Sequence, residues 1–258
     1  MPFRPAEMLL GITWDAHDHA GLVPHMIECL SGDGFGQLAE FLRRPGPGGA
    51  SLADAMMLGA RAADSPLSPH WVNVVAHFHD PCTHRGLAGL PCSAAAAAAD
   101  IQRRAVGEWR RGDRRTACID LGRCLHLIAD VGGIPHHASG IGYLVGDPHG
   151  HRDYEDWLRD NENWRRYVAT NGGYYAPWHK SHLCAGGVHA TSSERTYDWI
   201  DQAAVRSREL MPLVDKRRQG YREAFPYVAG ILVPATIRWG AGFIQRFFAD
   251  PAVGALQA

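Results

Sequence analysis

The sequence predicts an all-α protein, a single compact multi-helix domain, and three observations lead to this prediction. Apolar residues recur at helical spacing along most of the 258 residues. No alternating β-branched run lasts beyond a few residues, so strand signals are nearly absent. The loops are rich in Gly and Pro, but no internal repeat or linker divides the chain. We therefore expect one domain over residues 1–258.

Helical segments account for most of the predicted structure. They are Pro24 to Leu30, Phe35 to Arg43, Ser51 to Ala62, Ser93 to Arg111, Thr116 to Asp130, Arg152 to Asn171, Ser192 to Ala224 and Pro234 to Phe247. Asp113 and Thr116 stand where helix caps usually stand. Pro212 is expected to kink or split the seventh segment, because proline cannot make the backbone hydrogen bond of a helix interior. The apolar stretch 225–248 is interrupted by prolines and arginines, so we interpret it as a core helix and expect no transmembrane segment.

Composition and charge limit the classes of function. Hydrophobic residues make up 46% and charged residues 21%, which is ordinary for a globular protein. The formal net charge is -1, so no basic field supports a stable nucleic-acid partner. Residues 1–19 contain no apolar run long enough for a signal peptide. We therefore expect a cytoplasmic protein unless a leader has been removed.

Histidine is unusually frequent, and one helical segment carries the most informative example. The chain has 15 histidines against 27 aspartates and glutamates, and many of them adjoin Asp, Glu, Gly or Pro. His126 and Asp130 are four residues apart, so both project from one helix face. The Gly-Gly-Ile-Pro sequence that follows should end the helix and let His136 or His137 approach the same space.

A second pair of the same kind follows this turn. His151 and Glu155 are also four residues apart on a predicted helix. Either pair alone is weak evidence, because exposed helices often carry His and Glu at this spacing by chance. Two pairs joined by a Pro-His-His turn are stronger evidence for a metal site. Imidazole and carboxylate ligands suit Zn²⁺, and a carboxylate can bridge two ions.

The order of these residues resembles the zinc-binding signature of the bacterial zinc phospholipase C family, which includes the clostridial alpha-toxin catalytic domains. The segment 76–81, Ala-His-Phe-His-Asp-Pro, is similar to that family's His-Phe-aromatic-Asp-Pro segment. Asp64 stands about a dozen residues before His77, where the family has an aspartate ligand. Trp14 and His25 are similar to its N-terminal tryptophan and the histidine of its first helix. The matches keep their order from Trp14 to Glu155, and the resemblance implies a compact all-α fold.

Carried over residue by residue, the resemblance implies two to three zinc ions per chain. The implied ligands are Asp64, His77, His126 and Asp130 for one ion, His137, His151 and Glu155 for a second, and Trp14, His25 and the bridging Asp130 for a third. The resemblance also implies that Asp64 is catalytic, acting as the general base.

The N-terminal region departs from the family pattern. In the family, the tryptophan is the first residue and binds metal through its free amine. Here Trp14 follows thirteen residues, which we treat as an N-terminal extension, 1–13. His17 or His19 would then replace it, or the third site would be weak or empty.

The turn after Asp130 contains one residue more than the family pattern. Counting from Asp130 selects His136 as the ligand, whereas counting from Pro135, and from the fourteen-residue gap to His151, selects His137. We favour His137. A further departure is Ser65, which stands where the choline-preferring relatives have an aromatic residue, so the resemblance does not define a headgroup.

These patterns predict a zinc-dependent phosphoric ester hydrolase, which cleaves a phosphodiester as phospholipase C does, by a metal-activated water. Its substrate would be a phosphate ester, with phospholipid at a membrane surface as one candidate. A single-strand-specific zinc nuclease would use a similar site, but nucleases of that type have aspartate in place of Glu155. The same patterns would also suit a biosynthetic enzyme that uses this metal-binding fold on a small molecule, or a metal-binding protein without catalysis.

Overall fold

Helices make up nearly all of the regular structure. The computed structural model describes residues 16–46, 48–64, 74–141, 147–175, 181–184, 187–190 and 196–254. The α-helices are α2 (Ala16–Gly32), α3 (Gly36–Arg43), α4 (Leu52–Ala62), α5 (Ala94–Arg110), α6 (Arg114–Gly133), α7 (His151–Arg159), α8 (Thr196–Glu209), α9 (Met211–Val214) and α10 (Phe225–Ala249). Short 3-10 helices are η1 (Val74–His77), η2 (Leu87–Gly89), η3 (His137–Ser139), η4 (Asp160–Tyr167) and η5 (Tyr221–Ala224). The predicted all-α class is confirmed.

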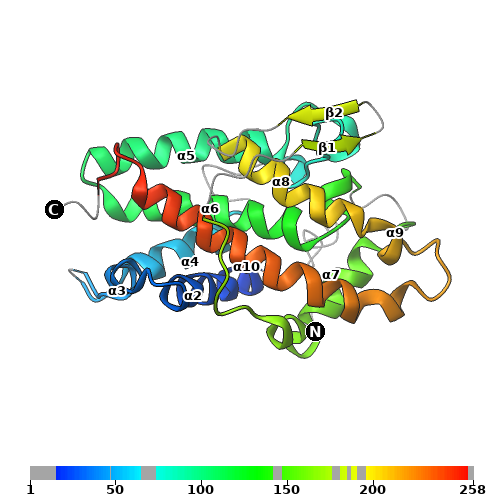
Figure 1. Cartoon of the computed structure of the whole chain (residues 1–258), viewed down its shortest axis with the longest axis horizontal. Helices are drawn as coiled ribbons and strands as arrows, with labels where there is room; N and C mark the ends of the chain where they lie inside the picture. Colours follow the sequence, from blue (N-terminus) through cyan, green and yellow to red (C-terminus); the bar gives the residue numbers. More distant parts are fainter. Residues whose placement is uncertain are drawn as a thin grey trace, which may run out of the picture.

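Helix α6 lies at the centre of the bundle (Figure 1). It contacts α4, α5, α8 and α10, and every residue from Asp120 to Gly133 is buried. The described helices share one hydrophobic core, which surrounds α6. A charged side chain on this stretch must therefore find its partner inside the protein, because leaving it unpaired would cost several kcal/mol.

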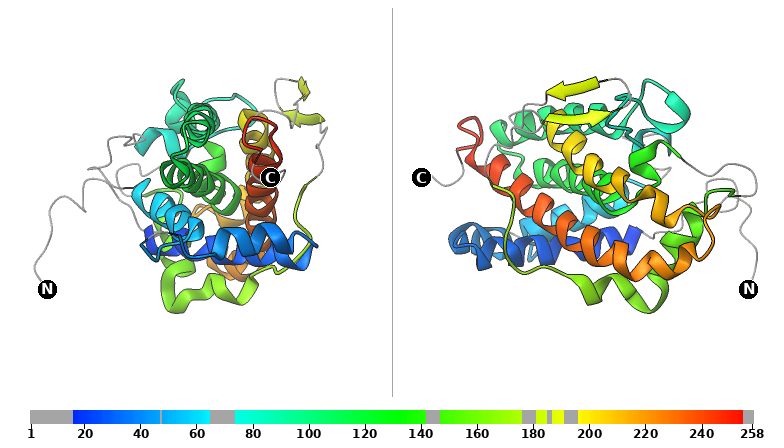
Figure 2. Two further views of the ribbon diagram at one scale, coloured as in Figure 1. Left: turned by 90° about the vertical axis from the view of Figure 1, so that its left-hand side faces the viewer. Right: turned by 45° about the vertical axis from the view of Figure 1, so that its right-hand side comes forward.

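Two short strands lie beside the helices, as both views in Figure 2 show. Strands β1 (Ser181–Cys184) and β2 (Gly187–Ala190) are antiparallel, with Ser181 opposite Ala190. The sequence did not predict this hairpin, because four residues are too few to show an alternating pattern.

Two details of the helix predictions concern caps and breaks. Asp113 caps α6 by accepting a hydrogen bond from the backbone N–H of Thr116 (3.0 Å), as expected, whereas Thr116 is not a cap but lies in the first turn of the helix. The predicted split at Pro212 is also confirmed, since α8 ends at Glu209 and Pro212 lies in the first turn of α9. The predicted helix from Arg152 to Asn171 is too long. It gives way to η4 after Arg159, and Glu162 has a positive φ of 52° that an α-helix cannot accommodate.

Two prolines predicted as helix starts instead lie within longer helices. Pro24 is inside α2, which begins at Ala16, and Pro234 is inside α10, which begins at Phe225. Each helix buries an apolar face, and this packing outweighs the missing backbone hydrogen bond. The earlier start of α2 has a functional consequence, because it places residues 16–23 on a helix beside α6.

Helix α10 is long and apolar enough to cross a membrane by length and composition. The candidate span is 221–249, and 72% of its most apolar window is buried inside the protein. Phe243, Ile244 and Phe247 belong to the shared core. The helix therefore packs as a core helix of the bundle.

Candidate metal centre

The centre of the site is a pair of buried side chains on α6. His126 and Asp130 are 0% and 2% exposed, and their spacing of one turn brings His126 Nε2 to 3.2 Å from Asp130 Oδ2. The ring Nδ1 of His126 donates to the backbone carbonyl of Ala60 (2.9 Å). In the neutral ring, this bond leaves the lone pair on Nε2, which faces the site.

Two glycines allow α4 to approach α6 closely enough for that bond. A Cβ atom on Gly59 would lie 1.9 Å from the carbonyl oxygen of Ile119, and one on Gly122 would lie 2.0 Å from that of Met56. Each helix thus presents a glycine to the backbone of the other. The close crossing places the end of α4 beside the α6 pair.

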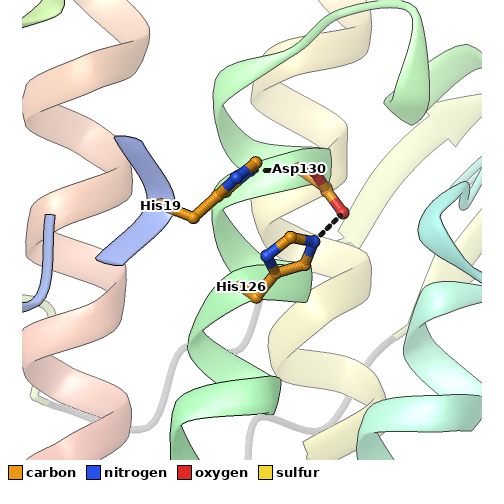
Figure 3. A group of neighbouring side chains, drawn as sticks. All are labelled: His19, His126 and Asp130. Carbon is orange, nitrogen blue, oxygen red and sulfur yellow. Dashed lines mark hydrogen bonds and ion pairs between the residues drawn. The ribbon is translucent and has the colours of Figure 1, made fainter. Parts of the chain in front are cut away.

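Asp130 is the hub that connects three histidines from different parts of the chain. Its Oδ2 atom is 2.8 Å from His77 Nδ1, and its Oδ1 atom is 3.1 Å from His19 Nε2. Figure 3 shows His19 and His126 next to each other, with both rings directed toward the carboxylate of Asp130. The ring centroids of His19 and His126 are 4.0 Å apart. His19, His126 and Asp130 therefore form one group that could hold a metal ion.

A second group shares His126 with the first. Asp64 Oδ1 is 3.3 Å from His126 Nε2 and 3.6 Å from His77 Nδ1. The two imidazole nitrogens of His77 and His126 are 3.2 Å apart. The other oxygen of Asp64, Oδ2, is buried and has no hydrogen-bond partner among the described residues. Asp64, His77 and His126 thus present three ligand atoms and one unused carboxylate oxygen.

The third group is formed where η3 meets α7. His151 Nε2 is 2.9 Å from both His137 Nε2 and Glu155 Oε1, and His137 Nε2 is 3.3 Å from Glu155 Oε1. His137 Nδ1 donates to the carbonyl of His77 (3.0 Å), so its Nε2 carries the lone pair in the neutral ring. The same Nδ1 is 3.6 Å from Asp130 Oδ1, which connects this group to the hub.

The structure distinguishes His136 from His137, for which the two ways of counting the turn gave different answers. His136 Nε2 donates to the backbone carbonyl of His149 (3.0 Å), and its ring stacks on His151 with centroids 5.2 Å apart. Burial and the neighbouring His151 lower the pKa of His136 to about 3, so this ring is neutral. His137, and not His136, enters the third group, as the register counted from Pro135 predicted.

Of the two N-terminal residues that the resemblance implied as ligands, the structure describes only His25, and it does not bring this residue to the centre. Trp14 lies outside the described residues. His25 is on α2, but its Nδ1 atom is 3.5 Å from Glu28 and its ring contacts Trp164, so it belongs to none of the groups found among the described residues. His19 stands beside Asp130 in its place. The prediction selected His25 because Pro24 was interpreted as the start of the helix, whereas α2 begins at Ala16.

Electrostatics favour a cation at this centre. Burial lowers the pKa of His126, but Asp64 and Asp130 outweigh it and raise that pKa well above its usual value. Burial raises the pKa of Asp130, but His126 and the other histidines outweigh it and hold that pKa well below its usual value. The pKa of Glu155 is also lowered, because His151 and His137 outweigh burial. The carboxylates are therefore ionised and attract positive charge, which protons or metal ions supply.

The donor set fits zinc. The three groups offer imidazole nitrogens and carboxylate oxygens, which are the ligands that Zn²⁺ prefers outside cysteine sites. Two histidines are fixed by bonds from the opposite ring nitrogen to a backbone carbonyl, as metal-binding histidines commonly are. Of the implied ligands that lie among the described residues, His25 alone is away from the centre.

The bundle has counterparts among solved structures. The alpha-toxin of Clostridium absonum matches it with a TM-score of 0.71 at 18% identity, over 92% of this chain and 65% of the toxin. The alpha-toxin of Clostridium perfringens, from avian strain SWCP, matches with a TM-score of 0.67 at 17% identity, over 94% of this chain and 65% of the toxin. The chain thus spans slightly less than two thirds of each toxin. No protein-family model and no curated protein matches the sequence.

The comparison defines the fold class. The chain has the all-α fold of the clostridial alpha-toxins, and the predicted likeness to their catalytic domains is confirmed at the level of the fold. The His and carboxylate groups described above are the chain's own, and they are groups that could hold metal ions.

Proposed function

We propose that the protein is a zinc-dependent phosphoric ester hydrolase that cleaves a phosphodiester as phospholipase C does. The observation that supports this proposal most directly is the joining of three His–carboxylate groups through Asp130 and His126. Two to three zinc ions per chain would share these ligands. A hub carboxylate between neighbouring ions is the arrangement expected where both the attacking and the leaving oxygen of a phosphoryl group are stabilised.

When bound at such a site, zinc lowers the pKa of water to about 7 and supplies positive charge to phosphate oxygens. The protein's own contribution is orientation and proton transfer. Asp64 is the proposed general base, because its Oδ2 atom is buried and unused among the described residues. Burial raises the pKa of Asp64, but His126, His77 and His19 outweigh it and lower that pKa, so the carboxylate is ionised and able to accept a proton.

The proposed substrate is a phosphodiester, with phospholipid presented at a membrane surface as the first candidate. The fold shared with the alpha-toxins supports this choice over a small-molecule substrate. The formal net charge of -1 supports it over nucleic acid, because a nucleic-acid enzyme usually presents a basic surface.

The test compares three substrates: a chromogenic phosphocholine ester, phospholipid micelles and single-stranded DNA. We expect zinc-dependent hydrolysis of the first two and loss of activity with a chelator. Asp64→Asn should slow turnover by orders of magnitude while most of the zinc is retained. Asp100→Asn is the matched control, because Asp100 is 72% exposed and pairs at the surface with Arg103.

Different results would replace the proposal. Hydrolysis confined to single-stranded DNA would identify a nuclease. Full zinc occupancy without turnover of any phosphoester would leave a metal-binding protein, or an enzyme that acts on another class of small molecule.

A further inference from the structure

A fourth group of metal-ligand side chains lies apart from the Asp130 hub. It consists of His79, His84 and Asp201, whose ligand atoms all lie within 4.8 Å of one another. Asp201 is on α8, and the two histidines belong to the segment between η1 and η2. Neither the phosphodiesterase proposed above nor the ligand set implied by the sequence uses these residues.

The three side chains converge on one atom. Asp201 Oδ1 is 2.7 Å from His79 Nε2 and 3.0 Å from His84 Nδ1. His79 and Asp201 are both 0% exposed, whereas the side chain of His84 is 31% exposed. Two ligands are therefore buried and the third lies at the surface, where an ion could enter.

This group has the same donors as the His137–His151–Glu155 group and similar spacing. Both consist of two imidazoles and one carboxylate, and the distances of 2.7 and 3.0 Å are close to the 2.9 and 3.3 Å at Glu155. Three protein ligands of this kind leave one position of a tetrahedral zinc ion open for water or a small anion.

The group is separate from the hub although the two are close in sequence. His77 faces Asp130, and His79, two residues later, faces Asp201. The backbone N–H of His79 donates to the carbonyl of His137 (3.0 Å), which fixes the segment between the two groups.

The loop that carries His84 is held in place by contacts independent of the histidines. The backbones of Asp80 and Arg85 pair across the loop, with the N–H of Asp80 donating to the carbonyl of Arg85 (2.8 Å). Arg208, about two turns after Asp201 on α8, donates to Asp80 Oδ1 through Nε (2.9 Å). His84 itself has a positive φ of 56°, and its ring reaches Asp201 on α8 from this conformation. The loop and α8 therefore hold the candidate ligand side chains in position without the help of an ion.

We propose that His79, His84 and Asp201 form an additional zinc-binding site, distinct from the Asp130 centre, which ties the loop 80–85 to α8. Its ligand class is a divalent ion of the zinc type, because two imidazoles and a carboxylate suit Zn²⁺ better than the oxygen-seeking Ca²⁺ or Mg²⁺.

The test counts zinc per chain in the full-length protein after equilibration with free zinc. His84→Asn is the main variant, because asparagine tolerates a positive φ and lacks the imidazole. His149→Asn is the matched control, since His149 contacts Asp215 (3.3 Å) but belongs to none of the groups found among the described residues. We expect His84→Asn to bind about one zinc fewer than wild type, and His149→Asn to match wild type.

Asp201→Asn gives a second measurement, because the amide can still accept hydrogen bonds while the charge that holds a cation is removed. If this variant folds, it should also lose about one zinc. Cobalt substitution supplies a spectroscopic readout, with part of the visible absorption lost in His84→Asn. Equal zinc counts in wild type and His84→Asn would overturn the proposal. Because the comparison counts ions and not turnover, it stands or falls independently of the proposed hydrolase.

Discussion

Two buried aspartates on α6 show how the same side chain serves two purposes. Asp120 and Asp130 are 0% and 2% exposed. Asp120 is bound by two guanidinium groups: Arg104 contacts both of its oxygens (2.6 and 2.9 Å), and Arg123 contacts Oδ1. Asp130 is surrounded by histidines instead.

The two aspartates differ in whether the side chains that surround them can lose a proton. A guanidinium does not lose its proton in a protein and has no lone pair to offer, so Asp120 is closed to metal. An imidazole can lose its proton near neutral pH and then bind a metal ion. The end of α6 near Asp120 is therefore structural, and the end near Asp130 is suited to chemistry.

The largest expected effect separates these two roles. Asp130→Asn should remove about two metal ions and lower turnover by orders of magnitude, because the hub carboxylate loses its charge. Asp120→Asn should keep the metal in the folded protein but lower the free energy of unfolding by about 3 kcal/mol, since two arginines lose their counter-charge. Elemental analysis and denaturant unfolding of both variants would check this. Equal metal loss in both would show that the two aspartates do not differ in kind.

The next effect tests the close approach of α4 and α6. Gly122→Ala should lower the free energy of unfolding by about 3 kcal/mol, the upper end of the range for overpacking, because its Cβ would collide with the backbone of Met56. Gly107→Ala on α5 is the control. There the Cβ meets only the side chain of Arg111, at 3.7 Å, so helix propensity should raise stability by up to about 1 kcal/mol. If Gly122→Ala left the free energy of unfolding unchanged, the close approach of α4 and α6 would not matter for stability.

A smaller effect concerns the adjacent histidines after α6. His137→Ala should lose about one metal ion, because its ring faces His151 and Glu155. His136→Ala should retain that ion and lose some stability, because its ring bonds a backbone carbonyl and stacks on His151. Paired zinc titrations would reveal the ranking, and the reverse order would favour the register counted from Asp130.

The smallest effect is expected on α2. His19→Ala should lower the affinity for the metal ion beside Asp130. His25→Ala should leave the zinc content unchanged, because His25 contacts Glu28 and Trp164 instead. Competition with a chelator would measure this difference. If His25→Ala lost more zinc than His19→Ala, the ligand set implied by the family resemblance would be the better description.

The sequence alone was sufficient to predict those parts of the candidate site that depend on the spacing of residues along one helix. The pairs His126/Asp130 and His151/Glu155 could be identified because four residues make about one helical turn. The start of α2 was missed because proline is common at helix starts, and tertiary packing overrode that preference at Pro24. The sequence indicated His19 only as one of two alternatives to Trp14, and not as a residue of the first helix, because that helix was expected to begin after it.

The His79–Asp201 contact could not be predicted from the sequence, for a different reason. The two residues are 122 positions apart, and no short-range pattern connects them. The Gly59–Gly122 crossing likewise depends on which faces of two helices meet, and a single glycine in a helical segment carries no such information.

The way in which the histidine rings are held also determines which substitutions the site can tolerate. His126, His137 and His136 each donate to a main-chain carbonyl, at Ala60, His77 and His149. A carbonyl acceptor remains whatever side chain occupies its residue, so substitutions at Ala60 that preserve the backbone would leave His126 correctly turned. The orientation of these three rings therefore depends on the course of the main chain and not on the side chains of the residues that supply the carbonyls.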